Sequence, residues 1–341
     1  MNDTFTQRNE QESLKFLIDA QPKKEQSKNI SIERLNNPDM MYLPNGKLNA
    51  PYLFQMGEKL EKAQDHAHAK TIYQAILKSH DFSAAALFRL GRCYEAEKNV
   101  HEACNYYQQS LSYLPLLEAM SRLAAIHIQL GRDEKAADIL ERALHLKDLT
   151  HTTQYELHKS LGQCFFRLNK KSAAKASFEK ALSVNPQSEA AATSMGAIYL
   201  QEGRNLDAKS FYEKALSINP LNTEALTGAG CAYLALGDKA LAHDAFEKSL
   251  QIAIHNPKAI FYIVTCAYDL KKYSAAEKLL DLYMQQTQPN PHLFYALAGL
   301  QFHLGKYSQS ARSVTKVLTL EPDHVGALEL RSLLEKRSYV C

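Results

Sequence analysis

Apolar residues recur three and four positions apart from residue 50 almost to the C-terminus, which is the spacing of amphipathic helices. These helical patterns are each about three to four turns long, and they come in pairs. The turn inside a pair often carries Gly or Asn, which suit the left-handed conformation that ends a helix. This feature occurs at Gly131, Asn169, Gly203, Gly237 and Gly305. The pattern therefore predicts an all-α chain of helix-turn-helix repeats.

The helix pairs recur with a period of 34 residues. Pro186 and Pro220 stand 34 positions apart, and so do Gly162 and Gly196. Extended over residues 50–324, this period gives eight repeats, which start near Ala50, Ala84, Leu117, Tyr155, Glu189, Thr223, Pro257 and Pro291. Since one repeat cannot bury its apolar face alone, such repeats must stack, and about three or more are needed for stability.

Small and aromatic residues recur at fixed places within the repeats. We expect a glycine in the first helix to remove a side chain where the second helix must approach closely. These glycines are Gly57, Gly91, Gly162, Gly196 and Gly230. We expect aromatic residues to fill the space between repeats, and those of the second helix are Tyr73, Tyr107, Phe178, Tyr212 and Phe246.

Two segments depart from the period. Residues 151–154 add four positions between the third and fourth repeats, so we expect a bend or a looser contact at mid-chain, with three repeats before it and five after. Residues 325–341 follow the last repeat. Their leucines predict a capping helix over residues 325–337 that covers the exposed face of the last repeat.

Residues 1–49 lie outside the repeats and are mostly polar, so we expect this segment to be partly disordered. Its apolar stretches are Leu14–Ile18 and Met40–Leu43. They either pack on the first repeat, lie in a groove of the protein itself or recruit a partner.

Leu-Gly, an aromatic residue, alanine, a second aromatic residue, alanine and proline recur at fixed offsets, and in this the chain resembles the tetratricopeptide repeat family. The repeat at residues 155–188 carries nearly the whole pattern, with His158 in place of its first aromatic residue. The resemblance covers residues 50–324. It implies a right-handed α-solenoid of about eight repeats and a role in binding other proteins.

The charge and the hydropathy of the chain limit which partners and which cellular location we expect. The net charge of +3 is too small to indicate a nucleic-acid-binding groove. No apolar stretch approaches the ~18 residues that a membrane-spanning helix needs. The first residues show no basic-then-apolar signal sequence, so the expected location is the cytoplasm.

No residue pattern points to catalysis, a metal or a cofactor. No two cysteines are spaced as C-x-x-C, and Cys93, Cys164 and Cys266 stand at the tenth position of their repeats, where the family uses a small buried residue. His66 and His68 are two positions apart on a helix and face different directions. We therefore expect no enzymatic activity, no metal and no cofactor.

The family resemblance implies that the first helix of each repeat lines the concave surface on which partners bind. The positions that usually point into this groove are charged in the early repeats, small in the middle and aromatic at the end. The candidate partner-binding residues are Phe88, Arg89, Arg92, Arg122, Lys159, Gln163, Phe166, Thr193, Ala197, Thr227, Phe261, Tyr268, Tyr295 and Phe302. Aromatic and arginine side chains are the usual binding hot spots.

The predicted function is that of a non-catalytic scaffold or adaptor that binds a peptide or helical segment of a protein partner in this groove. The alternative is a ligand-gated regulator or a secretion-type chaperone, whose groove holds a peptide or the protein's own N-terminal segment. Some co-chaperones of the family hold a C-terminal carboxylate with Lys, Asn and Arg, but Ser194, Glu224 and Gly228 stand at three of those positions. The sequence specifies no oligomeric state.

Overall fold

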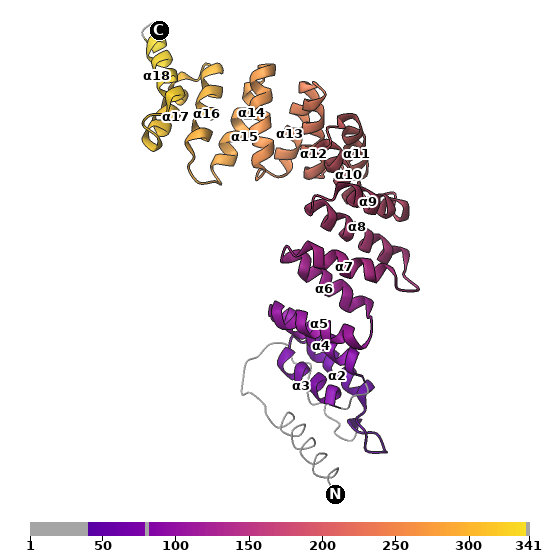
Figure 1. Cartoon of the computed structure of the whole chain (residues 1–341). Helices are drawn as coiled ribbons and strands as arrows, with labels where there is room; N and C mark the ends of the chain where they lie inside the picture. Colours follow the sequence, from indigo (N-terminus) through magenta and orange to yellow (C-terminus); the bar gives the residue numbers. More distant parts are fainter. Residues whose placement is uncertain (1–39, 79–81, 339–341) are drawn as a thin grey trace, which may run out of the picture. The chain divides into compact units, whose positions relative to one another are not determined.

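The computed structural model describes residues 40–78 and 82–338. In these ranges the chain forms 17 α-helices and no strand, which confirms the all-α repeat fold. The chain divides into two compact units, unit 1 ending at Thr150 and unit 2 beginning at His151 (Figure 1). Of the N-terminal segment 1–49, residues 1–39 with Leu14–Ile18 lie outside the described residues. In the second apolar stretch, Met41 is buried in one cluster with Leu53 and Ile72 of the first repeat.

Unit 1 contains three repeats and unit 2 contains five repeats followed by one more helix. In each repeat a first helix is followed by a second, which packs against it. Unit 1 consists of α2 (Ala50–Lys62), α3 (His66–Lys78), α4 (Ser83–Ala96), α5 (Val100–Tyr113), α6 (Leu117–Gln129) and α7 (Asp133–Leu144). Unit 2 consists of α8 (His151–Arg167), α9 (Lys171–Val184), α10 (Glu189–Gln201), α11 (Asn205–Ile218), α12 (Thr223–Ala235), α13 (Lys239–Ile252), α14 (Pro257–Leu270), α15 (Tyr273–Met284), α16 (Pro291–His303), α17 (Tyr307–Leu320) and α18 (Val325–Ser338).

Side-chain caps fix where many of the first helices begin. A polar side chain just before the helix accepts a backbone N–H of the first turn, which would otherwise lack a partner. The residues that do so are Asn49, Ser188, Asn222, Asn256 and Asn290, before α2, α10, α12, α14 and α16. Prolines in the first turns of α2, α14 and α16 favour the same starts.

All eight turns inside the repeats use one left-handed residue. The glycines and Asn169 singled out in the sequence have positive φ, as expected. The same conformation occurs at Gln64, Lys98 and Lys271, with φ of 62°, 61° and 58°. These residues stand at the equivalent place in their repeats, so the geometry of the turn is imposed by the packing of the two helices.

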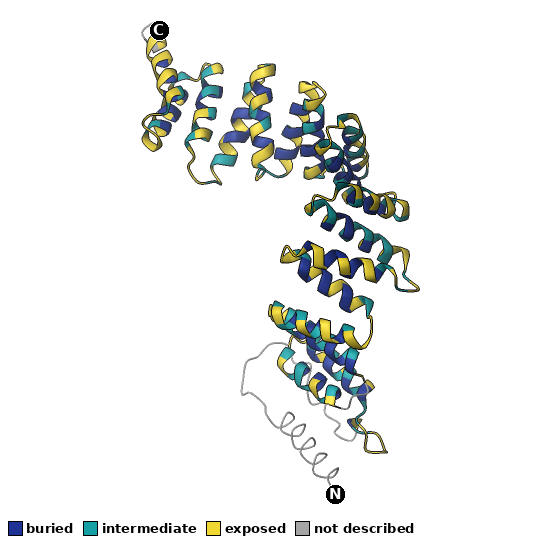
Figure 2. Cartoon of the chain, viewed as in Figure 1, coloured by how far each residue is buried: buried dark blue, intermediate teal, exposed yellow. Residues whose placement is uncertain are grey.

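The second helix approaches the first closely at the glycine, as predicted, and the atoms that meet the glycine are those of the aromatic ring of the second helix. A Cβ atom on Gly57, Gly91, Gly162, Gly196 or Gly230 would come within 2.9 Å of the ring atoms of Tyr73, Tyr107, Phe178, Tyr212 or Phe246, respectively. Most of these rings are fully buried, and the buried residues form a band along the interior of each unit (Figure 2). Close packing of this kind makes a larger residue at the glycine positions unfavourable, because the ring would have to shift.

Both segments that depart from the 34-residue period are helical. Residues 151–154 extend the N-terminus of α8, which reaches 17 residues, and the boundary between the two units falls just before them. Helix α18 buries Ala327, Leu330 and Leu334 in one cluster with residues of α16 and α17. The division of the whole chain into a polar segment, an array and a cap stays a prediction, because residues 1–39 lie outside the described part.

Candidate partner-binding surfaces

The arginines predicted to start the groove in unit 1 are paired with carboxylates of the same unit. The side chain of Glu61 on α2 is only 8% exposed, and its carboxylate lies 3.6 Å from the Arg89 guanidinium and 3.2 Å from that of Arg92. Arg89 also pairs with Glu58. The Tyr73 hydroxyl donates a hydrogen bond to Glu61 at 2.5 Å. Burial and this carboxylate both raise the pKa of Tyr73, which keeps the phenol protonated.

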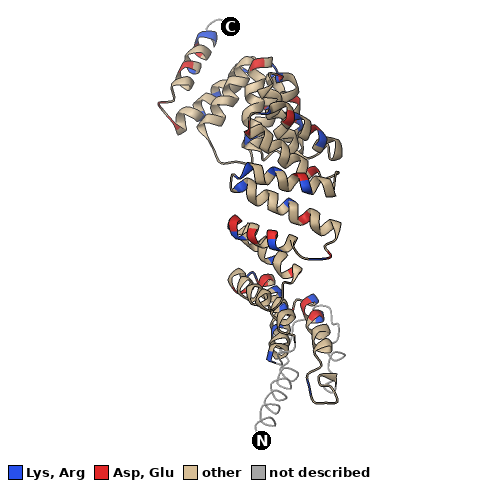
Figure 3. Cartoon of the chain, turned by 45° about the vertical axis from the view of Figure 1, so that its right-hand side comes forward, with Lys and Arg blue, Asp and Glu red and all other residues tan. Residues whose placement is uncertain are grey.

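The same arrangement recurs one repeat later. The Tyr107 hydroxyl donates to Glu95 at 2.5 Å, and the guanidinium of Arg122 lies 3.3 Å from the same carboxylate. Acidic and basic residues occur on the same helices of unit 1 (Figure 3). The arginine candidates at this end of the expected groove are therefore paired with carboxylates of unit 1. Phe88, the remaining candidate here, is half-buried with its ring 5.8 Å from that of Tyr107.

In the first repeat of unit 2, the candidate residues lie in different environments. The Lys159 ammonium lies 2.6 Å from Glu156 and 5.1 Å from the centre of the Tyr155 ring. Phe166 packs against a buried cluster that includes Phe178. Gln163 is exposed. Of these candidates, Gln163 has its side chain most available to a partner.

The small residues predicted to lie at the bottom of the groove connect one repeat to the next. Thr227 is only 6% exposed, and its hydroxyl accepts a hydrogen bond from the Asn256 side chain at 2.9 Å. Thr193 is 8% exposed and accepts one from Asn222 at 3.5 Å. Asn222 and Asn256 also cap the next first helix, so each threonine supports the start of the following repeat. Both threonines are thus buried and Ala197 is half-buried, and a partner contact at these residues stays a prediction.

Three of the four aromatic candidates of α14 and α16 are exposed. Phe261 is 66% exposed, and its ring meets that of Tyr262 edge-on at 5.3 Å. Tyr268 and Tyr295 are each somewhat more than one-third exposed. Burial, together with neighbouring tyrosines, raises the pKa of Tyr268 to about 12. Phe302 is half-buried against the α16–α18 cluster.

The cysteines serve packing, as predicted from their positions. Cys93, Cys164 and Cys266 are fully buried, and burial raises the pKa of Cys93 to about 12. A thiol with this pKa stays protonated near neutral pH and is a poor nucleophile. Cys341 lies outside the described residues.

One group of potential metal ligands was missed in the sequence. On α13, Nδ1 of the buried His243 lies 3.4 Å from Asp244 and 3.7 Å from Glu247. The sequence pattern that could have revealed this group is a His, an Asp and a Glu within about one helical turn. The Lys272 ammonium lies 3.7 Å from the Asp244 carboxylate and would repel a cation there. We infer no metal site from these residues.

The geometry defines an α-helical repeat protein of the class that serves as a protein-interaction scaffold. Models of the tetratricopeptide repeat family match residues 84–116, 119–151, 156–188, 190–220 and 223–253. The chain therefore belongs to the tetratricopeptide repeat family, whose fold is generally non-catalytic. No helix in the described ranges is both long enough and apolar enough to cross a membrane.

Several solved structures share this fold. Pseudomonas aeruginosa pilF is 20% identical with a TM-score of 0.51, over 63% of this chain and 96% of that one. A tetratricopeptide repeat protein from Parabacteroides merdae is 14% identical with a TM-score of 0.51, over 74% and 99%. The C-terminal part of a repeat protein from Cytophaga hutchinsonii is 16% identical with a TM-score of 0.50, over 81% and 98%. These likenesses concern the fold alone. No curated protein sequence matches the chain.

Proposed function

We propose that this protein is a scaffold or adaptor that binds an apolar peptide or an amphipathic helix of a partner protein on the first-helix surface formed by α14 and α16. The observation that carries the proposal is the exposure of Phe261, which is 66% accessible although it lies on a well-packed helix. Covering a phenylalanine side chain stabilises a complex by up to about 1.5–3 kcal/mol.

Two tyrosines extend this surface. Tyr268 follows Phe261 by seven positions on α14, which places it on the same side of the helix. Tyr295 stands on α16 at the position equivalent to Phe261, 34 residues later. Three partly exposed rings on two neighbouring first helices match the apolar anchors of a bound helix or peptide better than they match a polar ligand.

The proposed partner is a protein segment rather than a nucleic acid, because the net charge is only +3 and the arginines of unit 1 are paired. The proposed place of action is the cytoplasm. The candidates that remain accessible, above all Phe261, are proposed to make the contacts, whereas Thr193 and Thr227 are proposed to support the surface from within.

A pull-down from cells that naturally make the protein tests this proposal. The full chain with Phe261→Ala should lose specific partners that the unmodified chain retains, with the helix content unchanged by circular dichroism. Leu206→Ala is the matched control, because Leu206 is 72% exposed on the second helix α11. The same partners and the same amounts with Phe261→Ala and with the unmodified chain would overturn the proposal.

A further inference from the structure

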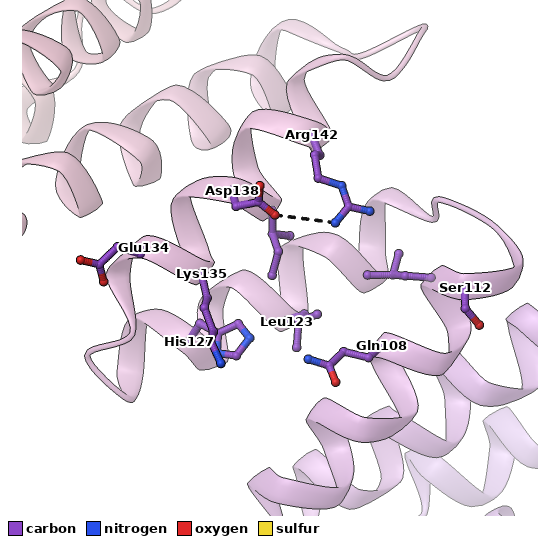
Figure 4. A pocket seen from close by; sticks show the side chains of 10 residues that line it. Gln108, Ser112, Leu123, His127, Glu134, Lys135, Asp138 and Arg142 are labelled. Carbon is purple, nitrogen blue, oxygen red and sulfur yellow. Dashed lines mark ion pairs between the residues drawn. The ribbon is translucent and has the colours of Figure 1, made fainter.

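A cavity of about 570 Å³ opens between α5, α6 and α7 in unit 1 (Figure 4). Leu111, Leu123 and Ile139 provide its apolar lining, and Gln108, His127 and Lys135 are among its polar residues. Two of its three helices are second helices, so it differs from the first-helix surface proposed above, which lies in unit 2. Its volume is in the range of natural ligand sites, about 300–1,000 Å³.

At the place of the cavity, this repeat lacks two aromatic rings that the preceding repeat has. In the preceding repeat, Tyr94 of the first helix stacks on Tyr106 of the second helix, with ring centres 5.2 Å apart. The residues at the equivalent positions here are His127 and Ile139, which are smaller. Both residues line the cavity.

A third residue that differs between the two repeats is the one that lies over the first of these rings. The Lys70 ammonium lies 4.5 Å from the centre of the Tyr94 ring and pairs with Glu97 at 2.7 Å. The residue equivalent to Lys70 in the next repeat is Cys104, which does not reach as far. Three shorter side chains at this contact thus leave space that Tyr94, Tyr106 and Lys70 fill in the preceding repeat.

His127 is a buried polar group without a partner at one ring nitrogen. It is 3% exposed, and its Nδ1 has no hydrogen-bond partner in the described part of the chain. Burial, helped by the positive charges of Arg132 and Lys135, lowers the pKa of His127, so the ring is neutral near neutral pH. A buried polar atom without a hydrogen bond is energetically unfavourable. A ligand that forms a hydrogen bond with this atom removes that cost, which favours binding.

The charges around His127 favour an anion. The Asp138 carboxylate is already 3.7 Å from the Arg142 guanidinium, and Figure 4 shows the Glu134 carboxylate directed away from His127. Lys135 forms no ion pair in the described residues, and its ammonium lies on the His127 side in the same view. The ammonium and a ring N–H of His127 can therefore both donate to one acceptor.

We propose that this cavity binds an acidic side chain of a partner peptide, whose carboxylate accepts hydrogen bonds from Lys135 and His127 while a neighbouring apolar side chain rests on Leu111, Leu123 and Ile139. The apolar lining distinguishes this occupant from a free inorganic anion, which would leave most of the cavity unfilled. The site does not depend on the surface of α14 and α16, so either proposal can fail alone.

Capped peptides test the proposal with the full chain. One set carries Glu between two residues chosen from Leu, Ile, Val and Phe, and the matched set carries Gln in place of Glu. We expect the best Glu peptide to bind about tenfold more tightly than its Gln counterpart in calorimetric titration. It should also shift the NMR signals of the His127 ring and raise its titration midpoint.

Variants of the cavity decide the outcome. Lys135→Met should reduce binding of the Glu peptide to the level of the Gln peptide, whereas Lys147→Met, at an exposed lysine outside the cavity, should leave it unchanged. The double variant His127→Tyr/Ile139→Phe should fill the cavity and abolish binding. If this variant does not fold, Lys135→Met still decides. Equal binding of both peptide sets, binding unaffected by Lys135→Met, or no binding of any peptide would each overturn the proposal.

Discussion

Gly162 on α8 lies so close to Phe178 on α9 that a Cβ atom would come within 2.8 Å of the ring. Phe178 is fully buried and packs against Met195 and Ile198 of the next repeat, so the ring cannot move aside freely. The glycine therefore sets the distance between the two helices of this repeat.

The first prediction is that Gly162→Ala destabilises the protein. The added methyl group overpacks a filled core, which costs about 1–3 kcal/mol of the free energy of unfolding. Urea unfolding followed by circular dichroism measures the loss. The control is Gln163→Ala, the exposed neighbour on the same helix, which should change stability by less than ~0.5 kcal/mol. Equal stability of the two variants would contradict the close contact.

The second prediction concerns the left-handed turn residue Lys271, which has a φ of 58°. A side chain costs roughly 1–2 kcal/mol in this conformation, and glycine avoids the cost. Lys271→Gly should therefore raise the thermal midpoint, even though the folded protein gains no contact. Lys278→Gly, in the exposed middle of α15, should lower it, since glycine in a helix interior costs ~1 kcal/mol. A decrease for both variants would argue against a left-handed Lys271.

The third prediction compares the two threonines that join repeats. Thr227→Val removes the acceptor that lies 2.9 Å from the Asn256 side chain and the partner of Ser249 at 2.9 Å. The loss of stability should be about 1–2 kcal/mol. Thr193→Val should cost less, because its contact with Asn222 is longer, at 3.5 Å. Denaturant melts of both variants test the order, and a larger loss for Thr193→Val would refute it.

The fourth prediction is a loss of stability on acidification. Burial is the main cause that lowers the pKa of His127 and of His158, with positive charges from Arg132 and Lys135 or from Lys180 adding to it. Below the unfolded pKa of 6.5, the unfolded chain binds protons that the folded chain does not, so stability present above that pH is lost as pH falls. The slope is at most about 1.4 kcal/mol per pH unit for each histidine.

Unfolding measured from about pH 7.5 to about pH 5.5 tests this dependence. The double variant His127→Gln/His158→Gln should flatten it. His101→Gln is the control, because the His101 side chain is 93% exposed and its removal should leave the profile unchanged. A profile that stays as steep in the double variant would place the titrating groups elsewhere.

The repeat and its internal packing could be predicted because both depend on residue types at fixed spacing. Gly196 and Tyr212 each recur every 34 residues in neighbouring repeats as a glycine or an aromatic residue. This recurrence indicates that both positions serve helix packing. The left-handed turn at Lys98 could not be predicted, since lysine does not favour that conformation and the packing of α4 and α5 imposes it.

The contacts of the candidate partner-binding residues were harder to predict from sequence. Arg122 and Glu95 are 27 positions apart on different repeats, and no intrahelical pattern relates them. The cavity beside His127 was missed because it comes from smaller residues rather than from a motif. By contrast, Phe261 was recognised as a candidate by its position alone.

The constant distances between packed residues limit how this chain can change its length. A glycine and its ring stand 16 positions apart, and a threonine and the next cap stand 29 apart. A single residue inserted between the glycine and its ring would change both spacings, whereas insertion of a complete 34-residue repeat would preserve them. The four extra residues at 151–154 are tolerated because they precede the first packed position of α8. Duplication of whole repeats is therefore the route by which such a chain can lengthen without a new packing arrangement.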